Sequence, residues 1–93
     1  MTFFDLNGKT ALVTGATGGI GAAIARALHA QGAVVAISGR NTEKLQALAA
    51  ELKTNVHIVA ADLSSAAAAD DLVKAAESAM GQIDILVNNA GLT

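Results

Sequence analysis

The segment that most restricts the folds open to this chain is a glycine-rich stretch, TGATGGIG, at residues 14–21. It follows an apolar run at residues 9–13 and opens a helical pattern. The N-terminus of a helix carries unpaired backbone N–H groups and a partial positive charge, so it can hold a phosphate without a basic side chain. Glycine lets the backbone turn sharply and approach a ligand with no Cβ in between. The segment therefore predicts a seat for the pyrophosphate of a nucleotide cofactor, the alternative being a turn that serves only tight packing.

Apolar runs of strand length alternate with helical patterns along the chain. The strand-like runs are apolar at consecutive positions, which is typical of parallel strands covered by helices on both faces. Asn41 is placed to cap the second helix and Ser64 or Ser65 the third, while Gly32 and Gly81 are placed to end the first and third helices. The predicted strands are 10–13, 33–37, 56–60 and 83–87, and the predicted helices are 20–30, 42–52 and 66–80.

This alternation predicts an α/β fold of the Rossmann type, a doubly wound parallel sheet built as a single domain over residues 1–93. Right-handed crossovers from a central first strand give the strand order 3-2-1-4, with four strands and three helices. They put the glycine-rich segment beside the point where the winding reverses, which is where such folds bind ligands. Residues 83–87 then form an edge strand that is too hydrophobic for exposure. We expect it to be covered by homo-oligomer formation or by further chain, because the sequence stops shortly after it.

Composition narrows the range of partners. The chain has no cysteine, which excludes disulfides, thiolate metal sites and a cysteine nucleophile, and His29 and His57 are too few and too separated for a metal cluster. The net charge of -2, with lysine and arginine scattered, argues against nucleic acid or anionic lipid as a partner. No apolar run approaches the roughly 18 residues of a membrane span, and no signal peptide opens the chain. We expect a cytoplasmic protein without a metal, membrane or nucleic-acid partner.

Two motifs, one after the first predicted strand and one after the fourth, resemble those of a known family. The glycines at positions 15, 19 and 21 fit neither G-x-G-x-x-G nor a P-loop, and Asn88-Asn89-Ala90-Gly91 follows the fourth predicted strand. Together these motifs resemble the short-chain dehydrogenase/reductase family, over essentially the whole chain. The opening FDLNGKTALV (4–13) and the closing IDILVNNAGLT (83–93) most resemble the 3-oxoacyl-[acyl-carrier-protein] reductases of that family.

The resemblance implies a nicotinamide dinucleotide site built around both motifs. The first motif would supply the pyrophosphate contacts, and the second would lie on the adenosine ribose side of the cofactor, with Asn88 instead tying neighbouring strands together. The implied pyrophosphate contacts are Gly15, Gly19, Ile20 and Gly21, and the implied ribose contacts are Thr17, Gly18, Asn89, Ala90 and Gly91.

The end of the second predicted strand favours NADP (NADPH) over NAD. An acidic residue that would accept the ribose 2′-OH of NAD is absent, and Ser38-Gly39-Arg40 stands in its place. A guanidinium can pair bidentately with a 2′-phosphate, which a carboxylate would repel. The alternative is a solvated arginine beside the start of a helix.

After the third predicted strand, Asp62 and Leu63 resemble the family pair at the adenine, with the Asp62 carboxylate accepting from the exocyclic amine and Leu63 packing near the ring. Asp62 could equally complement the dipole of the helix that follows. Both interpretations stay open.

The resemblance also implies chemistry that this sequence does not carry. In the family, a tyrosine, a lysine four residues later and a nearby serine protonate the substrate carbonyl while the nicotinamide delivers hydride, yet this chain has no tyrosine. We therefore expect no catalytic residue and no turnover from these 93 residues alone. The function indicated is the NADPH-binding N-terminal portion of an oxidoreductase acting on an acyl-carrier-protein thioester. The alternative is a nucleotide-binding or self-associating half-domain without catalysis.

Overall fold

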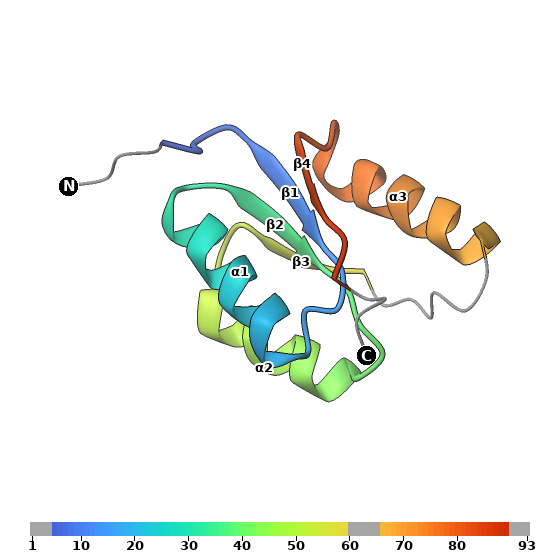
Figure 1. Cartoon of the computed structure of the whole chain (residues 1–93). Helices are drawn as coiled ribbons and strands as arrows, with labels where there is room; N and C mark the ends of the chain where they lie inside the picture. The colour runs from blue at the N-terminus through green and yellow to red at the C-terminus, as the bar shows by residue number, and fades with distance from the viewer. Residues whose placement is uncertain (1–4, 60–65, 90–93) are drawn as a thin grey trace.

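A computed structural model describes residues 5–59 and 66–89 of the chain. Strands and helices alternate from one end to the other, as the apolar pattern predicts (Figure 1). The strands are β1 (Thr10–Val13), β2 (Val34–Ile37), β3 (Val56–Ile58) and β4 (Ile85–Val87). The helices are α1 (Gly19–Ala30), α2 (Thr42–Leu52) and α3 (Ala66–Met80).

The four strands form one parallel sheet in the order β3-β2-β1-β4, which confirms the predicted α/β architecture. The register places Val13 opposite Ile37 of β2 on one side and opposite Val87 of β4 on the other. The carboxyl ends of these three strands therefore meet at the same edge of the sheet. The chain winds from β1 toward β3 on one side and returns to β4 on the other, so this edge includes the point where the winding reverses.

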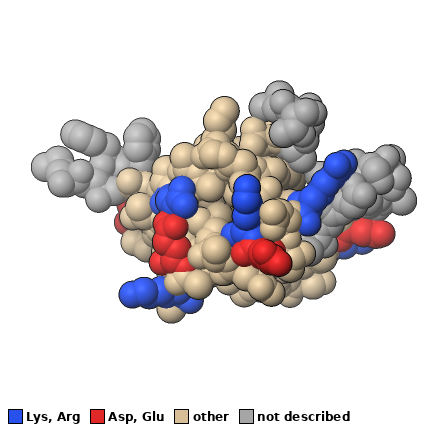
Figure 2. Space-filling model, turned by 90° about the horizontal axis from the view of Figure 1, so that it is seen from below, with Lys and Arg blue, Asp and Glu red and all other residues tan. Residues whose placement is uncertain are grey.

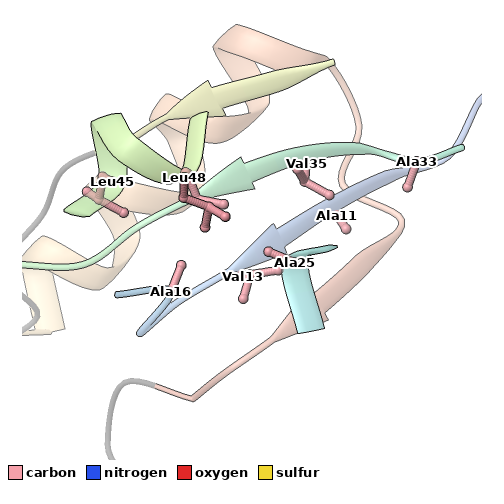
Figure 3. Close-up of a cluster of buried hydrophobic side chains, with 9 residues drawn as sticks. Ala11, Val13, Ala16, Ala25, Ala33, Val35, Leu45 and Leu48 are labelled. Atoms are coloured by element: carbon pink, nitrogen blue, oxygen red, sulfur yellow. The ribbon is translucent and has the colours of Figure 1, made fainter. Parts of the chain in front are cut away.

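The two central strands, β1 and β2, are buried on both faces, in keeping with their mostly apolar residues at successive positions. Side chains of β1 and β2 that point one way pack with Ala25 of α1 and with Leu45 and Leu48 of α2 (Figure 3). Side chains that point the other way, Leu12 and Ala36, pack with Leu72 and Ala76 of α3. Figure 1 shows the same division, with α1 and α2 on one side of the sheet and α3 on the other.

Local capping sets the limits of the helices. The Asn41 side chain accepts a hydrogen bond from the backbone N–H of Lys44 at 3.1 Å, which confirms its predicted role at the start of α2. Helix α1 ends at Ala30, and Gly32, two residues later, has a φ of 102° that favours glycine. The N–H of Gly32 donates to the His29 carbonyl and that of Ala33 to the Leu28 carbonyl, a Schellman motif. Gly81, with φ of 84°, follows α3, whereas Ser64 and Ser65 lie outside the described residues.

Two strands begin later than predicted, and hydrogen bonds explain both differences. The expected strand 33–37 starts at Val34 because the Ala33 amide is used to close α1. The expected strand 83–87 starts at Ile85 because the Asp84 carboxylate accepts from the backbone N–H of Thr10, at 3.0 Å, at the start of β1. The third strand is observed over Val56–Ile58, while the end of its predicted range, Ala60, lies outside the described residues.

Candidate cofactor site

The glycine-rich segment forms the turn from β1 to α1 at the carboxyl edge of the sheet. Gly15 makes the turn, with φ of 65°, a value that side chains disfavour. The chain then enters α1 at Gly19, preceded by Gly18 as the N-cap residue, which has no side chain to bond to the helix. The first turn of α1 contains no acidic side chain.

This helix start has donors without acceptors. Within the helix, the first bond to the N-cap carbonyl comes from Ala22, whose N–H donates to the Gly18 carbonyl at 2.9 Å. Among residues 5–59 and 66–89, no backbone or side-chain acceptor is recorded for the amides of Gly19, Ile20 and Gly21. Such amides, together with the helix dipole, attract an anion.

The glycines of this turn leave space at different places. Among residues 5–59 and 66–89, a Cβ added at Gly19 would meet nothing within 4 Å, and one at Gly18 would meet only the Gly15 carbonyl oxygen, at 3.8 Å. A Cβ at Gly21 would overlap that carbonyl oxygen and lie 2.8 Å from the carbonyl carbon. Gly21 is therefore required for helix packing, whereas the open space beside Gly18 and Gly19 is available to a ligand. Ile20 points into solvent beside it, with 68% of its surface exposed.

The end of β4 is tied to the same turn by hydrogen bonds. The Asn89 side chain donates to the Gly15 carbonyl at 3.2 Å, and the Asn89 backbone N–H donates to the Thr14 hydroxyl at 2.9 Å. The Thr14 hydroxyl is also 3.2 Å from the Val87 carbonyl oxygen and 3.3 Å from Asn88 Oδ1, in line with the predicted tying role of Asn88. The two sequence motifs, more than seventy residues apart, thus meet in one place.

The end of β2 lies at the same edge of the sheet, beside the end of β1. Ser38 is only 1% exposed, and its carbonyl accepts from the Ala16 N–H of the glycine-rich turn at 2.9 Å. Gly39 and Arg40 follow, and Arg40 is exposed. The Ser38 carbonyl therefore holds the β2–α2 loop against the β1–α1 turn. The spacing of residues in the sequence did not reveal this contact.

The remaining predicted site residues, Asp62, Leu63, Ala90 and Gly91, lie outside the described residues. Among the predicted contacts that are described, those from the ends of β1, β2 and β4 come together at the carboxyl edge: Gly15, Thr17, Gly18, Gly19, Ile20, Gly21, Ser38, Arg40 and Asn89.

A separate hollow of about 260 Å³ lies between α1 and α2. Its lining includes Thr17 of the glycine-rich turn, Lys44, and the ion pair between Arg26 and Glu51. Pockets that enclose a drug-sized ligand measure roughly 300–1,000 Å³, so this hollow is too small to hold a dinucleotide. The geometry of the strand ends, rather than this hollow, marks the candidate site.

Charged side chains on the face seen in Figure 2 are mixed, with Lys and Arg beside Asp and Glu rather than gathered into one basic area. No group of three or more His, Cys, Asp or Glu that could hold a metal ion occurs in the part of the chain that the structure describes. Nor does any helix there combine the length and the apolar character needed to cross a membrane.

Comparison with known proteins agrees with the fold. The family model described as short chain dehydrogenase matches residues 9–93. Nodulation protein G of Rhizobium sp. (strain N33) is 54% identical over 90 residues, which are 97% of this chain and 37% of that protein. The 3-oxoacyl-[acyl-carrier-protein] reductase FabG of Rickettsia bellii is 52% identical over 89 residues, 96% of this chain and 35% of that protein.

Two solved structures from Brucella melitensis share the fold. A short-chain dehydrogenase/reductase (glucose/ribitol dehydrogenase) superposes with a TM-score of 0.85 at 39% identity, covering 91% of this chain and 37% of its own. A 3-ketoacyl-(acyl-carrier-protein) reductase complexed with NADH gives a TM-score of 0.82 at 40% identity. That match covers 88% of this chain and 34% of the reductase. The chain thus spans little more than a third of the length of the proteins that it matches.

Proposed function

This chain belongs to the short-chain dehydrogenase family, and on that premise we propose that it is the NADPH-binding, N-terminal portion of a 3-oxoacyl-[acyl-carrier-protein] reductase. In this proposal residues 1–93 act as one cofactor-binding domain. Members of the family bind nicotinamide dinucleotides, and one structural neighbour is complexed with NADH. The thioester substrate is suggested by the reductases among the relatives.

The observation that carries the proposal is the open start of α1. Three amides without an acceptor among the described residues, Gly19 to Gly21, lie beside a space in which a Cβ at Gly19 would meet none of those residues within 4 Å. A diphosphate fits such a cradle because it is anionic and rich in acceptor oxygens. When bound, the nicotinamide would supply hydride, and these residues would hold the cofactor by its phosphates.

We attribute selectivity for NADPH to the residues that follow β2. Ser38 stands where NAD-binding folds place an acidic residue, and the exposed Arg40 follows two residues later. A guanidinium there would bind a 2′-phosphate by charge-assisted hydrogen bonds. Asp62 and Leu63 are proposed at the adenine, and Asn89, Ala90 and Gly91 on the ribose side, in keeping with the family resemblance.

Turnover is not expected from the 93 residues alone. The chain contains no tyrosine to protonate a substrate carbonyl, and neither Lys44 nor Lys74 has such a partner. Oxidation of NADPH in the presence of a 3-oxoacyl thioester should therefore stay at the rate of the protein-free control. Clear turnover would contradict this part of the proposal.

Binding is tested by titrating NADPH against the unmutated chain and against Gly19→Ala. A methyl group at Gly19 meets none of the described residues within 4 Å, so the fold should be retained. The new methyl group would occupy the space proposed for the diphosphate, and we expect affinity to fall at least about tenfold, as on loss of a charge-assisted hydrogen bond. Equal binding by both proteins, or none by the unmutated chain, would contradict the proposed site.

A second candidate function, self-association without catalysis, is favoured by β4. This strand pairs only with β1 among the described strands, and Leu86 at its centre is 58% exposed. An apolar strand edge is a template for pairing with another chain. The two candidates are compatible, because the cofactor site lies at the strand ends and the free edge along the length of β4.

A further inference from the structure

The two loops that carry the proposed cofactor contacts are packed against each other. The Ala16 N–H of the β1–α1 turn donates to the Ser38 carbonyl of the β2–α2 loop at 2.9 Å, and both residues are buried. One residue further along each loop, Thr17 lies against Gly39. The turn proposed to hold the diphosphate and the loop proposed to hold the 2′-phosphate therefore form one unit.

Gly39 is constrained by the side chain of Thr17 rather than by its own backbone conformation. A Cβ at this position would lie 2.8 Å from Cγ2 of Thr17, closer than real Cβ atoms lie to their neighbours, and 3.2 Å from Oγ1 of Thr17, a tight contact. Its φ is not among the positive values found at other described glycines, such as Gly15 and Gly32. The Thr17 side chain thus occupies the place that a side chain at position 39 would take.

We propose that Gly39 is a positioning residue for nucleotide selectivity: its missing side chain lets Thr17 pack against the β2–α2 loop and so fixes the place of Arg40. This inference rests on the proposed NADPH site. A methyl group at position 39 would push the loop and Thr17 apart, and Arg40, the next residue, would move with the loop. Charge-assisted bonds to a 2′-phosphate depend on such geometry, whereas NADH has no 2′-phosphate and would sense only the displacement of Thr17, a contact that both nucleotides share.

The test compares the dissociation constants of NADPH and NADH for the unmutated chain, Gly39→Ala, and the double variant Gly39→Ala with Thr17→Ser. We expect Gly39→Ala to weaken NADPH binding about tenfold more than NADH binding, because only NADPH loses strength in a charge-assisted hydrogen bond, so that the preference for NADPH falls. Thr17→Ser removes Cγ2, the nearest atom to the new methyl, and keeps the hydroxyl. The double variant should therefore regain most of the preference for NADPH.

A matched control separates selectivity from general loss of stability. Leu72→Val shortens a core side chain on the α3 face, away from both loops, and should lower the thermal midpoint without changing the ratio of the two dissociation constants. An unchanged ratio in Gly39→Ala, or no recovery in the double variant, would overturn the positioning role while the proposed cofactor site stands. Failure of the unmutated chain to bind either nucleotide would overturn both.

Discussion

The glycines of the glycine-rich turn are constrained in different ways, although the sequence does not distinguish them. Gly15 adopts a positive φ, Gly21 leaves no room for a Cβ, and a Cβ at Gly19 would have no neighbour within 4 Å in the described part of the chain. The first two are needed for the polypeptide to fold back onto β1, and the third is needed only if something approaches the helix start. Stability and binding should therefore respond to different single substitutions within seven residues, 15–21.

Gly21→Ala should destabilise the fold. The added methyl would overlap the Gly15 carbonyl oxygen, and such overpacking typically costs about 1–3 kcal/mol. Thermal or urea unfolding followed by circular dichroism measures the loss, with Gly19→Ala as the control that adds the same methyl into open space. Equal stability of the two variants would show that Gly21 is not constrained by packing.

Arg40→Ala should reduce affinity for NADPH by about 1.5 to 3 kcal/mol, the usual range for a hydrogen bond to a charged group, and should affect NADH little. Calorimetric titration of both nucleotides measures this difference. Lys74→Ala removes the same charge from α3, on the opposite face of the sheet, and serves as the control. Equal affinity of the unmutated chain for NADPH and NADH would remove the basis for the 2′-phosphate contact.

Helices α1 and α2 are joined by an ion pair on their outer surface. Arg26 Nε lies 2.6 Å from Glu51 Oε2 and Arg26 Nη2 lies 3.0 Å from Glu51 Oε1, a bidentate arrangement. The hydrogen bond from Arg26, with its positive charge, holds the pKa of Glu51 below its ordinary value of 4.5. Both side chains are about half exposed, so the pair is screened by salt and contributes little on its own.

The Arg26–Glu51 ion pair should make the free energy of unfolding depend on pH in the acidic range. A carboxyl whose pKa is lower in the folded state stabilises the fold above its ordinary pKa, and this contribution is lost as the pH falls through the lowered value. We expect Glu51→Gln to be slightly less stable than the unmutated chain at neutral pH, and the difference to shrink below about pH 4.5. Urea unfolding at several pH values measures it. A difference independent of pH would contradict the ion pair, and Glu77→Gln on α3 is the control.

At the scale of the whole molecule, the helices cover the strands of the sheet unequally. Helices cover β1 and β2 on both faces, whereas β4 at the edge buries Ile85 and Val87 only in part and leaves Leu86 largely exposed. Leu86 lies opposite the buried Leu12 in the register with β1, so the apolar surface of the sheet continues outward to this strand. The exposed leucine marks a side of the molecule where a further contact would bury apolar area.

Leu86→Lys should therefore lower self-association of the 93-residue chain. A charge at an edge strand opposes pairing with a second copy because it cannot be buried without a partner. Sedimentation velocity over a range of protein concentrations measures the effect. Val73→Lys places the same residue on α3 at a site of 36% exposure and should leave association unchanged. A chain that is monomeric at every concentration would contradict the self-association proposal.

Much of the fold could be predicted because its signals are local. Apolar runs define the strands, the Asn41 side chain marks the start of α2, and Gly32 marks the end of α1, so the alternation alone leads to the order β3-β2-β1-β4. The convergence of residues 14–21 with Asn89 also follows, because parallel strands bring their carboxyl ends to one edge.

Contacts between segments distant in sequence could not be predicted in this way, because periodicity says which face a residue occupies but not which atom it meets. Tertiary packing decided that Asp84 delays the start of β4, that Thr17 fills the space left by Gly39, and that Arg26 pairs with Glu51. The sequence by itself determined the layered α/β architecture and the edge where a ligand would bind. Only the folded chain determined which glycine serves packing and which leaves room, since that depends on the distance from a missing Cβ to neighbouring atoms.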